Sequence, residues 1–366
     1  MTKQKQRTSY IYEKTLSDYI GGFGRRATDG AEVGIEIEVE GTNLPRRGLK
    51  GWAIHEDGSL RGESAEYVFA GPATRDDIDV RLAAFAKAIE GVQINQSYRT
   101  SVHVHVNQQD VKLKDIYTQI LLYTIWEDVL GEQCGQERVG NLFALRAKDA
   151  EFYLERLLGA AQQDHLMHLN TQDLRYTAVN PMALFNHGTL EYRSMRGTTD
   201  VKLIRQWVDL LLALKDASIN NFETPLSMVQ DVSTLGPDGF AKKVFTPDQI
   251  SLFGKGWQDK VVEGTRLVQH IAHANPNKWA PEPKTKEKPK AAPTYSRYVS
   301  SATTAGQAEP GLAQLNTWVQ QGLAARPVEV RAAGGVPLNN LLRQTVIMDD
   351  VETAVAPEWA HDEDEI

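Results

Sequence analysis

The chain contains a single cysteine, Cys134, among 366 residues. It therefore cannot form an intrachain disulfide, and nothing in it requires an oxidising compartment. Cys134 also lacks the spaced partners of a zinc knuckle. Long apolar runs are missing, since the longest lies near residues 210–214 and is too short to span a bilayer. No signal-peptide core follows the basic N-terminus. We expect a cytoplasmic protein that does not enter a membrane.

The common sequence signatures of nucleotide-binding proteins and of serine hydrolases are absent too. The chain has no Gly-rich phosphate loop of the P-loop or dinucleotide type and no Gly-x-Ser-x-Gly elbow. If the protein uses ATP, metal ions and arginines must hold the phosphates. The net charge of −8 argues against broad non-specific binding to nucleic acid or anionic membranes.

The pattern of apolar residues divides the chain into four parts. A catalytic domain is expected over residues 31–278, after an N-terminal extension, 1–30. A Pro/Lys-rich linker, 279–296, cannot bury enough apolar surface to fold, and a C-terminal extension with an acidic tail, 297–366, follows it. Within the domain, strands are expected at 34–40, 100–107, 178–185 and 189–195, with a hairpin at 52–70 that turns at Asp57-Gly58; helices are expected at 76–92, 113–130, 147–158 and 201–214, with further helical segments to 272.

The first expected strand carries Glu36, Glu38 and Glu40, separated by apolar residues. Successive side chains of a strand point to opposite faces, so the three glutamates share one face. Such a run is usually the solvated face of a half-buried strand. Like charges on neighbouring same-face positions repel each other unless a cation lies between them, and clustered carboxylates suit Mg²⁺.

The second expected strand carries His103 and His105 on one face, opposite Val102, Val104 and Val106. A surface strand or a pair of hydrogen-bonded core imidazoles would explain this pattern without any ligand. His-x-His also presents two imidazoles to zinc. Beside several glutamates, one imidazole is compatible with Mg²⁺ or Mn²⁺, and the other with a phosphate.

The third expected strand places Glu191 and Arg193 on one face, with Arg196 just after them and Arg175 and Asn180 upstream. Glu191 and Arg193 alone could form a surface salt bridge that contributes little. Arginines concentrated beside glutamates also match a site that binds an anionic substrate through bidentate contacts. Glu66 lies within the second strand of the expected hairpin, where a carboxylate is less expected than in the preceding loop.

Together, these motifs resemble an enzyme family. Their order is Gly34-x-Glu36-x-Glu38, Asp57-Gly58-Ser59-Leu60 with Glu66, His103-Val104-His105-Val106, and Gly188-Thr189-Leu190-Glu191-Tyr192-Arg193. This set resembles the amidoligase family, carboxylate–amine ligases related to glutamine synthetase and glutamate–cysteine ligase. The resemblance covers about residues 33–214.

The resemblance implies an α+β fold like the catalytic domain of glutamine synthetase, with a curved, mainly antiparallel sheet, a polar concave face and helices packed outside. It implies two divalent ions, Mg²⁺ or Mn²⁺, around ATP, with Glu36, Glu38, Glu66, His103 and Glu191 as ligands. It also implies phosphate or substrate contacts, assigned to His105, Arg193, Arg175, Arg196 and Asn180. Glu63, near the position of a second glutamate in glutamine synthetase, would accept the proton of the amine.

The expected activity is ATP-dependent formation of an amide bond through an acyl phosphate. The substrates would be a small-molecule or peptide carboxylate and an amine, without nucleic acid or membrane partners, and a homo-oligomer is compatible with the sequence. Three alternatives remain open: a phosphotransferase of the same superfamily, a zinc hydrolase that uses His103 and His105, and a non-catalytic interaction protein that binds through its C-terminal extension.

Overall fold

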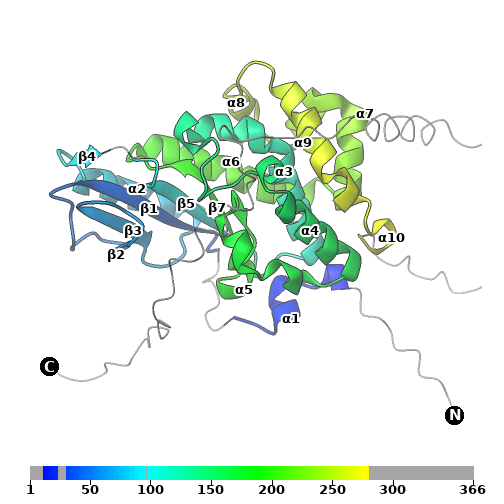
Figure 1. Ribbon diagram of the computed structural model, residues 1–366, viewed down its shortest axis with the longest axis horizontal. Helices are drawn as coiled ribbons and strands as arrows, with labels where there is room; N and C mark the ends of the chain where they lie inside the picture. Colours follow the sequence, from blue (N-terminus) through cyan, green and yellow to red (C-terminus); the bar gives the residue numbers. More distant parts are fainter. Residues whose placement is uncertain (1–10, 24–29, 96, 280–366) are drawn as a thin grey trace, which may run out of the picture. The chain divides into compact units, whose positions relative to one another are not determined.

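The computed structural model describes residues 11–23, 30–95 and 97–279 (Figure 1). All of them belong to one compact unit, Met1–Lys286. The predicted C-terminal extension and all but the first residue of the predicted linker lie outside the described residues. Among the residues that the structure describes, no helix is long and apolar enough to cross a membrane.

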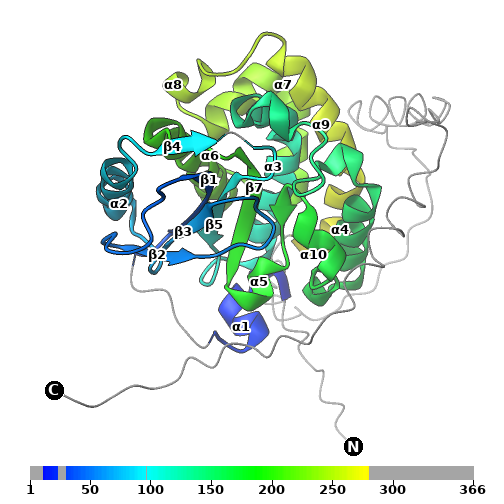
Figure 2. The ribbon, with the colours of Figure 1, turned by 60° about the vertical axis from the view of Figure 1, so that its left-hand side comes forward.

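A seven-stranded sheet forms one side of this unit (Figures 1 and 2). Its strands are β1 (Val33–Thr42), β2 (Trp52–His55), β3 (Ser64–Phe69), β4 (Gln93–Asn95), β5 (Ser101–Asn107), β6 (Val179–Asn180) and β7 (Thr189–Arg196). The spatial order is β2-β3-β1-β5-β7-β6, and β4 pairs with the end of β1 beyond β5. Every pairing between these strands is antiparallel, which confirms the predicted α+β class and the mainly antiparallel sheet.

Helices make up the rest of the described unit. The α-helices are α1 (Leu16–Ile20), α2 (Arg75–Ala88), α3 (Leu113–Cys134), α4 (Glu151–Gln163), α5 (Ala183–Asn186), α6 (Val201–Asn220), α7 (Pro225–Val244), α8 (Pro247–Ile250), α9 (Trp257–Ala272) and α10 (Pro276–Trp279). Short 3-10 helices lie at Ile11–Glu13, Gln136–Arg138, Ala147–Asp149, Leu166–Leu169 and Gln172–Tyr176. Local chemistry fixes several helix starts. The Asp200 carboxylate accepts the first free N–H groups of α6, and Thr224 and Ser227 form a capping box at α7.

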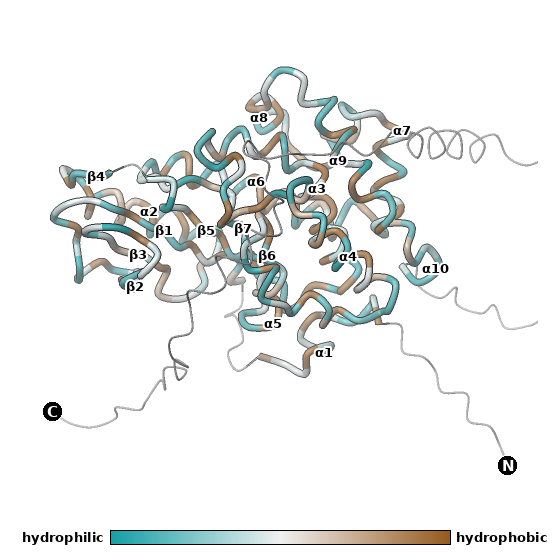
Figure 3. The backbone as a smooth tube through the Cα atoms, viewed as in Figure 1, coloured by the Kyte–Doolittle hydropathy of each residue, from teal (hydrophilic) through white to brown (hydrophobic). Residues whose placement is uncertain are grey.

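The core lies between one face of the sheet and these helices. Ile35 and Ile37 of β1 are fully buried on that face. From α3, the Gln119 amide donates to the Tyr192 hydroxyl of β7 at 2.8 Å, so α3 lies directly against the strand. Figure 3 shows the hydrophobic stretches concentrated along α3 and the central strands. The apolar side of the alternating strands therefore packs inward, which leaves the polar side to form the opposite face.

The N-terminal residues from 11 onward also pack into this unit. The Tyr12 ring lies 6.0 Å from that of Tyr117 and 4.4 Å from that of Trp279, measured between ring centroids. The indole N–H of the buried Trp279 donates to the Ala272 carbonyl at 2.9 Å. Residues near both ends of the described chain thus meet beside α3.

One predicted strand was wrong over most of its length. Residues 178–185 form only the two-residue β6, and the chain then turns into α5. Pro181 has no N–H to donate to a strand partner, and the Asn180 side chain accepts the Met182 N–H at 2.9 Å. These two features end the strand.

Candidate metal and substrate site

Strand register brings the predicted ligands together on the polar face of the sheet. Glu36 of β1 lies directly opposite His103 of β5, and Glu38 of β1 lies opposite Glu66 of β3. On the other side of β5, His105 pairs with Glu191 of β7. Directly opposed residues of an antiparallel pair project from the same face. The sheet therefore assembles side chains that are up to 155 residues apart in sequence.

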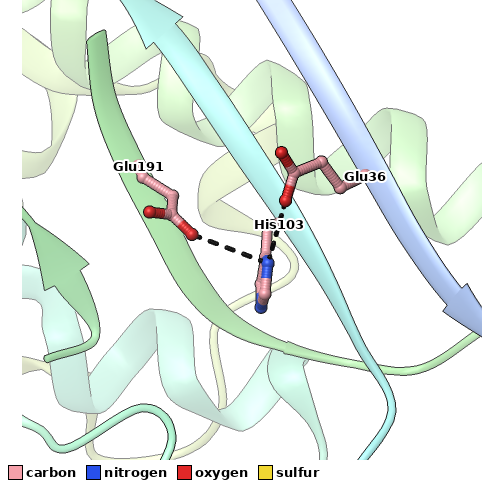
Figure 4. A group of neighbouring side chains, drawn as sticks. All are labelled: Glu36, His103 and Glu191. Carbon is pink, nitrogen blue, oxygen red and sulfur yellow. Dashed lines mark hydrogen bonds and ion pairs between the residues drawn. The ribbon is translucent and has the colours of Figure 1, made fainter. Parts of the chain in front are cut away.

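A first group of candidate metal ligands consists of Glu36, His103 and Glu191 (Figure 4). One ligand atom from each lies within 4.8 Å of the others. The Nδ1 of His103 is 3.2 Å from Glu36 Oε2 and 3.5 Å from Glu191 Oε1. His103 and Glu191 are almost completely buried. Two carboxylates and an imidazole at this spacing form a donor set for a divalent cation.

A second group consists of Glu38, Asp57 and Glu66, again with one ligand atom from each within 4.8 Å of the others. The sequence predicted Glu38 and Glu66 as ligands but treated Asp57 only as part of a turn. Asp57 does turn the chain, since its Oδ1 accepts the Ser59 N–H at 2.7 Å. The Asp-Gly-Ser motif alone predicts a turn. It does not identify Asp57 as a candidate ligand, because the sequence pattern does not give the path of the loop relative to the polar face.

The two groups concentrate negative charge. Burial, followed by the nearby carboxylates of Glu36, Glu38, Asp57 and Glu191, raises the pKa of Glu66 to about 7. Burial also acts to raise the pKa of Glu191, but Arg193, His105 and His103 together lower it below its usual value. Glu36 behaves similarly, because hydrogen bonds with His103 and His105 outweigh burial and hold its pKa well below the usual range. The histidines and Arg193 thus favour the ionised form of the carboxylates in the first group. In the second group, the neighbouring carboxylates leave an excess of negative charge.

A β-bulge in β7 sets the direction of its arginines. Val102 pairs with Met195 and Val104 with Tyr192, so Arg193 and Ser194 both lie opposite His103. The extra residue shifts the alternation, which turns Met195 into the core and places Arg196 opposite Ser101 on the polar side. Without the bulge, strict alternation from Glu191 would send Arg196 to the core face.

Arg193 is held beside the first group. Its guanidinium forms an ion pair with Glu191 and donates to the Phe143 carbonyl at 3.2 Å. The Asn180 amide donates to the other oxygen of Glu191 at 2.7 Å. Behind this strand, the buried Arg138 donates to the Arg193 carbonyl at 2.7 Å. Asn180 and Arg193 therefore both contact the candidate metal ligand Glu191.

The two histidines do not converge on one point. His105 Nε2 is 3.3 Å from Glu36 Oε1, whereas His103 contacts the other oxygen of that carboxylate. The remaining ring nitrogen of His105 hydrogen-bonds the Thr189 hydroxyl at 2.9 Å. His187 lies edge-on to His105, with ring centroids 5.8 Å apart. Among the described residues, the candidate ligand groups contain His103 and not His105, so this geometry does not favour a zinc ion held by both.

The other predicted site residues lie farther from the two groups. The Glu63 carboxylate accepts the Leu44 N–H at 3.0 Å and is 4.0 Å from Arg46. Glu63 is in neither group, so its placement does not support the predicted role as a base. Arg175 is exposed, with its guanidinium over the Tyr176 ring.

Arg196 contacts the Gln133 carbonyl at 3.3 Å and Glu137 at 3.6 Å. It also lines a cavity of about 210 Å³ to which Glu38 contributes. Of the arginines predicted from the sequence, Arg193 contacts a candidate ligand directly and Arg196 shares a cavity with one.

Comparison with known families agrees with this arrangement. Residues 82–215 match the model of a family described as "putative amidoligase enzyme". The matched segment contains His103, Asn180, Glu191 and Arg193, whereas the candidate ligands on β1 and β3 precede it. The comparison with curated proteins found no match. The family match supports a ligase as the class of this enzyme. On this evidence, residues 82–215 of the chain are similar to the amidoligase family.

Proposed function

We propose that this protein is an ATP- and divalent-metal-dependent ligase that joins a carboxylate to an amine. The observation that carries the proposal is the pair of neighbouring ligand groups, Glu36–His103–Glu191 and Glu38–Asp57–Glu66, on one polar sheet face with Arg193 beside them. These residues would hold two divalent cations, which would supply the positive charge that neutralises phosphate oxygens in phosphoryl transfer. Oxygen-rich ligands with a single imidazole suit Mg²⁺ or Mn²⁺.

The proposed reaction has two steps. A carboxylate oxygen of the substrate attacks the γ-phosphorus of ATP, and the bond to ADP breaks. The neutral amine then attacks the carbonyl carbon of the acyl phosphate, phosphate leaves and the nitrogen loses a proton. A free carboxylate is a poor electrophile, so the first step makes the second feasible.

Three residues beside the candidate ligands would have separate roles in this reaction. Arg193 stabilises negative charge on the transferred group, because its fixed guanidinium already lies at the edge of the first ligand group. Asn180 orients Glu191 through its amide hydrogen bond. His105 is held between Glu36 and Thr189 and presents a polar ring at the same face. Burial lowers the pKa of His105, but the contact with Glu36 raises it overall, which favours a cationic ring suited to phosphate contact.

The test measures ADP release from ATP and Mg²⁺ with a panel of carboxylic acids and amines, including amino acids, peptides and polyamines. We expect ADP release that depends on both an acid and an amine. Glu36→Gln and Glu191→Gln should each lose more activity than the ~10–100-fold typical of an outer-shell change. Glu155→Gln, an exposed change on α4, serves as the matched control and should keep full activity.

The outcomes separate the competing functions. Unchanged ADP release in both the Glu36 and Glu191 variants would refute the proposed site. ADP release with an acid alone, accompanied by a stable phosphorylated product, would indicate the phosphotransferase. Circular dichroism and thermal melting of each variant establish that it is folded.

A further inference from the structure

Ser101 links the two groups of candidate ligands. Its hydroxyl oxygen lies 2.6 Å from Glu38 Oε2 and 2.7 Å from His103 Nε2. Glu38 belongs to the second group and His103 to the first. All three side chains are at least 93% buried, so water does not compete for these hydrogen bonds. Neither composition nor motif singles out this serine in the sequence.

The hydrogen-bond inventory determines the direction of both bonds. A serine hydroxyl has one proton to donate, and an ionised carboxylate can only accept. Ser101 therefore donates to Glu38, and the 2.6 Å separation is typical of an O–H···O⁻ bond. The same oxygen must then accept from His103, so Nε2 of that ring carries a proton.

The opposite ring nitrogen is thereby left to face the first ligand group. His103 Nδ1 lies 3.2 Å from a Glu36 oxygen and 3.5 Å from a Glu191 oxygen. Nδ1 and the two carboxylate oxygens converge on a point that suits positive charge, which a metal ion would supply when bound and a proton on Nδ1 can supply without it. Outer-shell hydrogen bonds orient ligating imidazoles in this way at metal sites.

We propose that Ser101 is a positioning residue that makes Nδ1 the ligand atom of His103 and couples the two ligand groups through Glu38. An ion in the first group strengthens the donation from Nε2 to Ser101, which in turn strengthens the bond from Ser101 to Glu38. This inference rests on the proposed metal-dependent function.

Ser101→Ala tests the inference in the full-length protein, with Mn²⁺ as the probe in calorimetric titrations without nucleotide. We expect Ser101→Ala to weaken Mn²⁺ binding by ~10–100-fold, the usual effect of losing an outer-shell partner. Ser101→Thr keeps the hydroxyl and should restore binding. Ser218→Ala is the matched control. It removes a buried serine hydroxyl from α6, where it donates to the Lys215 carbonyl, and should leave Mn²⁺ binding unchanged.

Nitrogen NMR of the histidine rings in the metal-free protein provides a readout that a merely structural role would not move. In the wild type, Nε2 of His103 should carry a proton throughout. In Ser101→Ala, the neutral ring should carry its proton on Nδ1, because Nε2 loses the Ser101 hydroxyl as its acceptor while Glu36 stays 3.2 Å from Nδ1.

Two outcomes distinguish this inference from the proposed function. If the wild type binds Mn²⁺ and Ser101→Ala binds it equally well with the same ring protonation, the inference about Ser101 is overturned and the metal site stands. If the wild type binds no Mn²⁺, the proposed metal-dependent function itself is overturned.

Discussion

Glu66→Gln should stabilise the metal-free protein above neutral pH while removing a proposed metal ligand. Burial, with four neighbouring carboxylates, raises the pKa of Glu66 from 4.5 to about 7. The folded state thus binds this proton more tightly than the unfolded chain. The stabilisation that results is complete below about pH 4.5 and is lost as the pH rises through about 7.

The size of the effect follows from the pKa difference. At 1.36 kcal/mol for each pKa unit, the difference corresponds to about 3 kcal/mol between low and high pH. Glu66 is partly exposed, so solvent screening reduces the expected change to about 1–2 kcal/mol. Glutamine has the shape of glutamate without its charge. The variant should therefore gain about 1–2 kcal/mol over the wild type at about pH 8 and almost nothing at about pH 5.

Urea unfolding in the presence of a chelator, at about pH 5 and about pH 8, measures this difference. Glu155→Gln removes the same charge from an exposed position on α4 and should change little at either pH. Added Mg²⁺ should reverse the order, because it stabilises the wild type and not the variant. An equal effect of Glu66→Gln at both pH values, or a loss of stability at the higher pH, would contradict the reasoning.

Three further changes probe the second ligand group and the helix packing. Asp57→Asn should weaken binding of the second Mn²⁺ ion and spare the first, because Asp57 belongs to the second ligand group; loss of both ions together in calorimetry would be inconsistent with two separate groups. Gly264→Ala should destabilise the protein by about 1–3 kcal/mol, because the new Cβ would lie 2.3 Å from the Ile125 carbonyl oxygen where α9 crosses α3. In Gly159→Ala on α4, the new Cβ meets nothing within 4 Å, so the change should gain up to ~1 kcal/mol; denaturant unfolding of both variants makes the comparison, and equal effects would argue against the close approach.

Much of the site was predictable because a strand alternates with a period of two. That period places Glu36 and Glu38 on one face of β1 and His103 and His105 on one face of β5, whatever else the chain does. The buried apolar partners on the other face, such as Ile35 and Val104, then decide which side packs against helices. The fold class followed from the same alternation and from the helical spacing between strands.

The alternation of apolar and polar residues could not predict the local irregularities of the strands and loops. The bulge at Arg193 and Ser194 reverses the alternation, so the direction of Arg196 could not be read from its distance to Glu191. The connection after β2 carries Asp57 to the second ligand group, whereas Glu63, six residues later, contacts Leu44 and Arg46 instead. A loop has no fixed period, so the placement of its side chains depends on the surrounding structure.

By itself, the sequence determined which residues could bind metal ions and which face of each strand they occupy, because alternation is a property of one extended segment. Only the tertiary structure decided that these faces meet in two groups of three candidate ligands, because the register between strands places Glu36 opposite His103 and Glu38 opposite Glu66. It also decided that the buried hydroxyl of Ser101 lies between the groups. Contacts of this kind join positions far apart along the chain, and they come into being when the sheet forms.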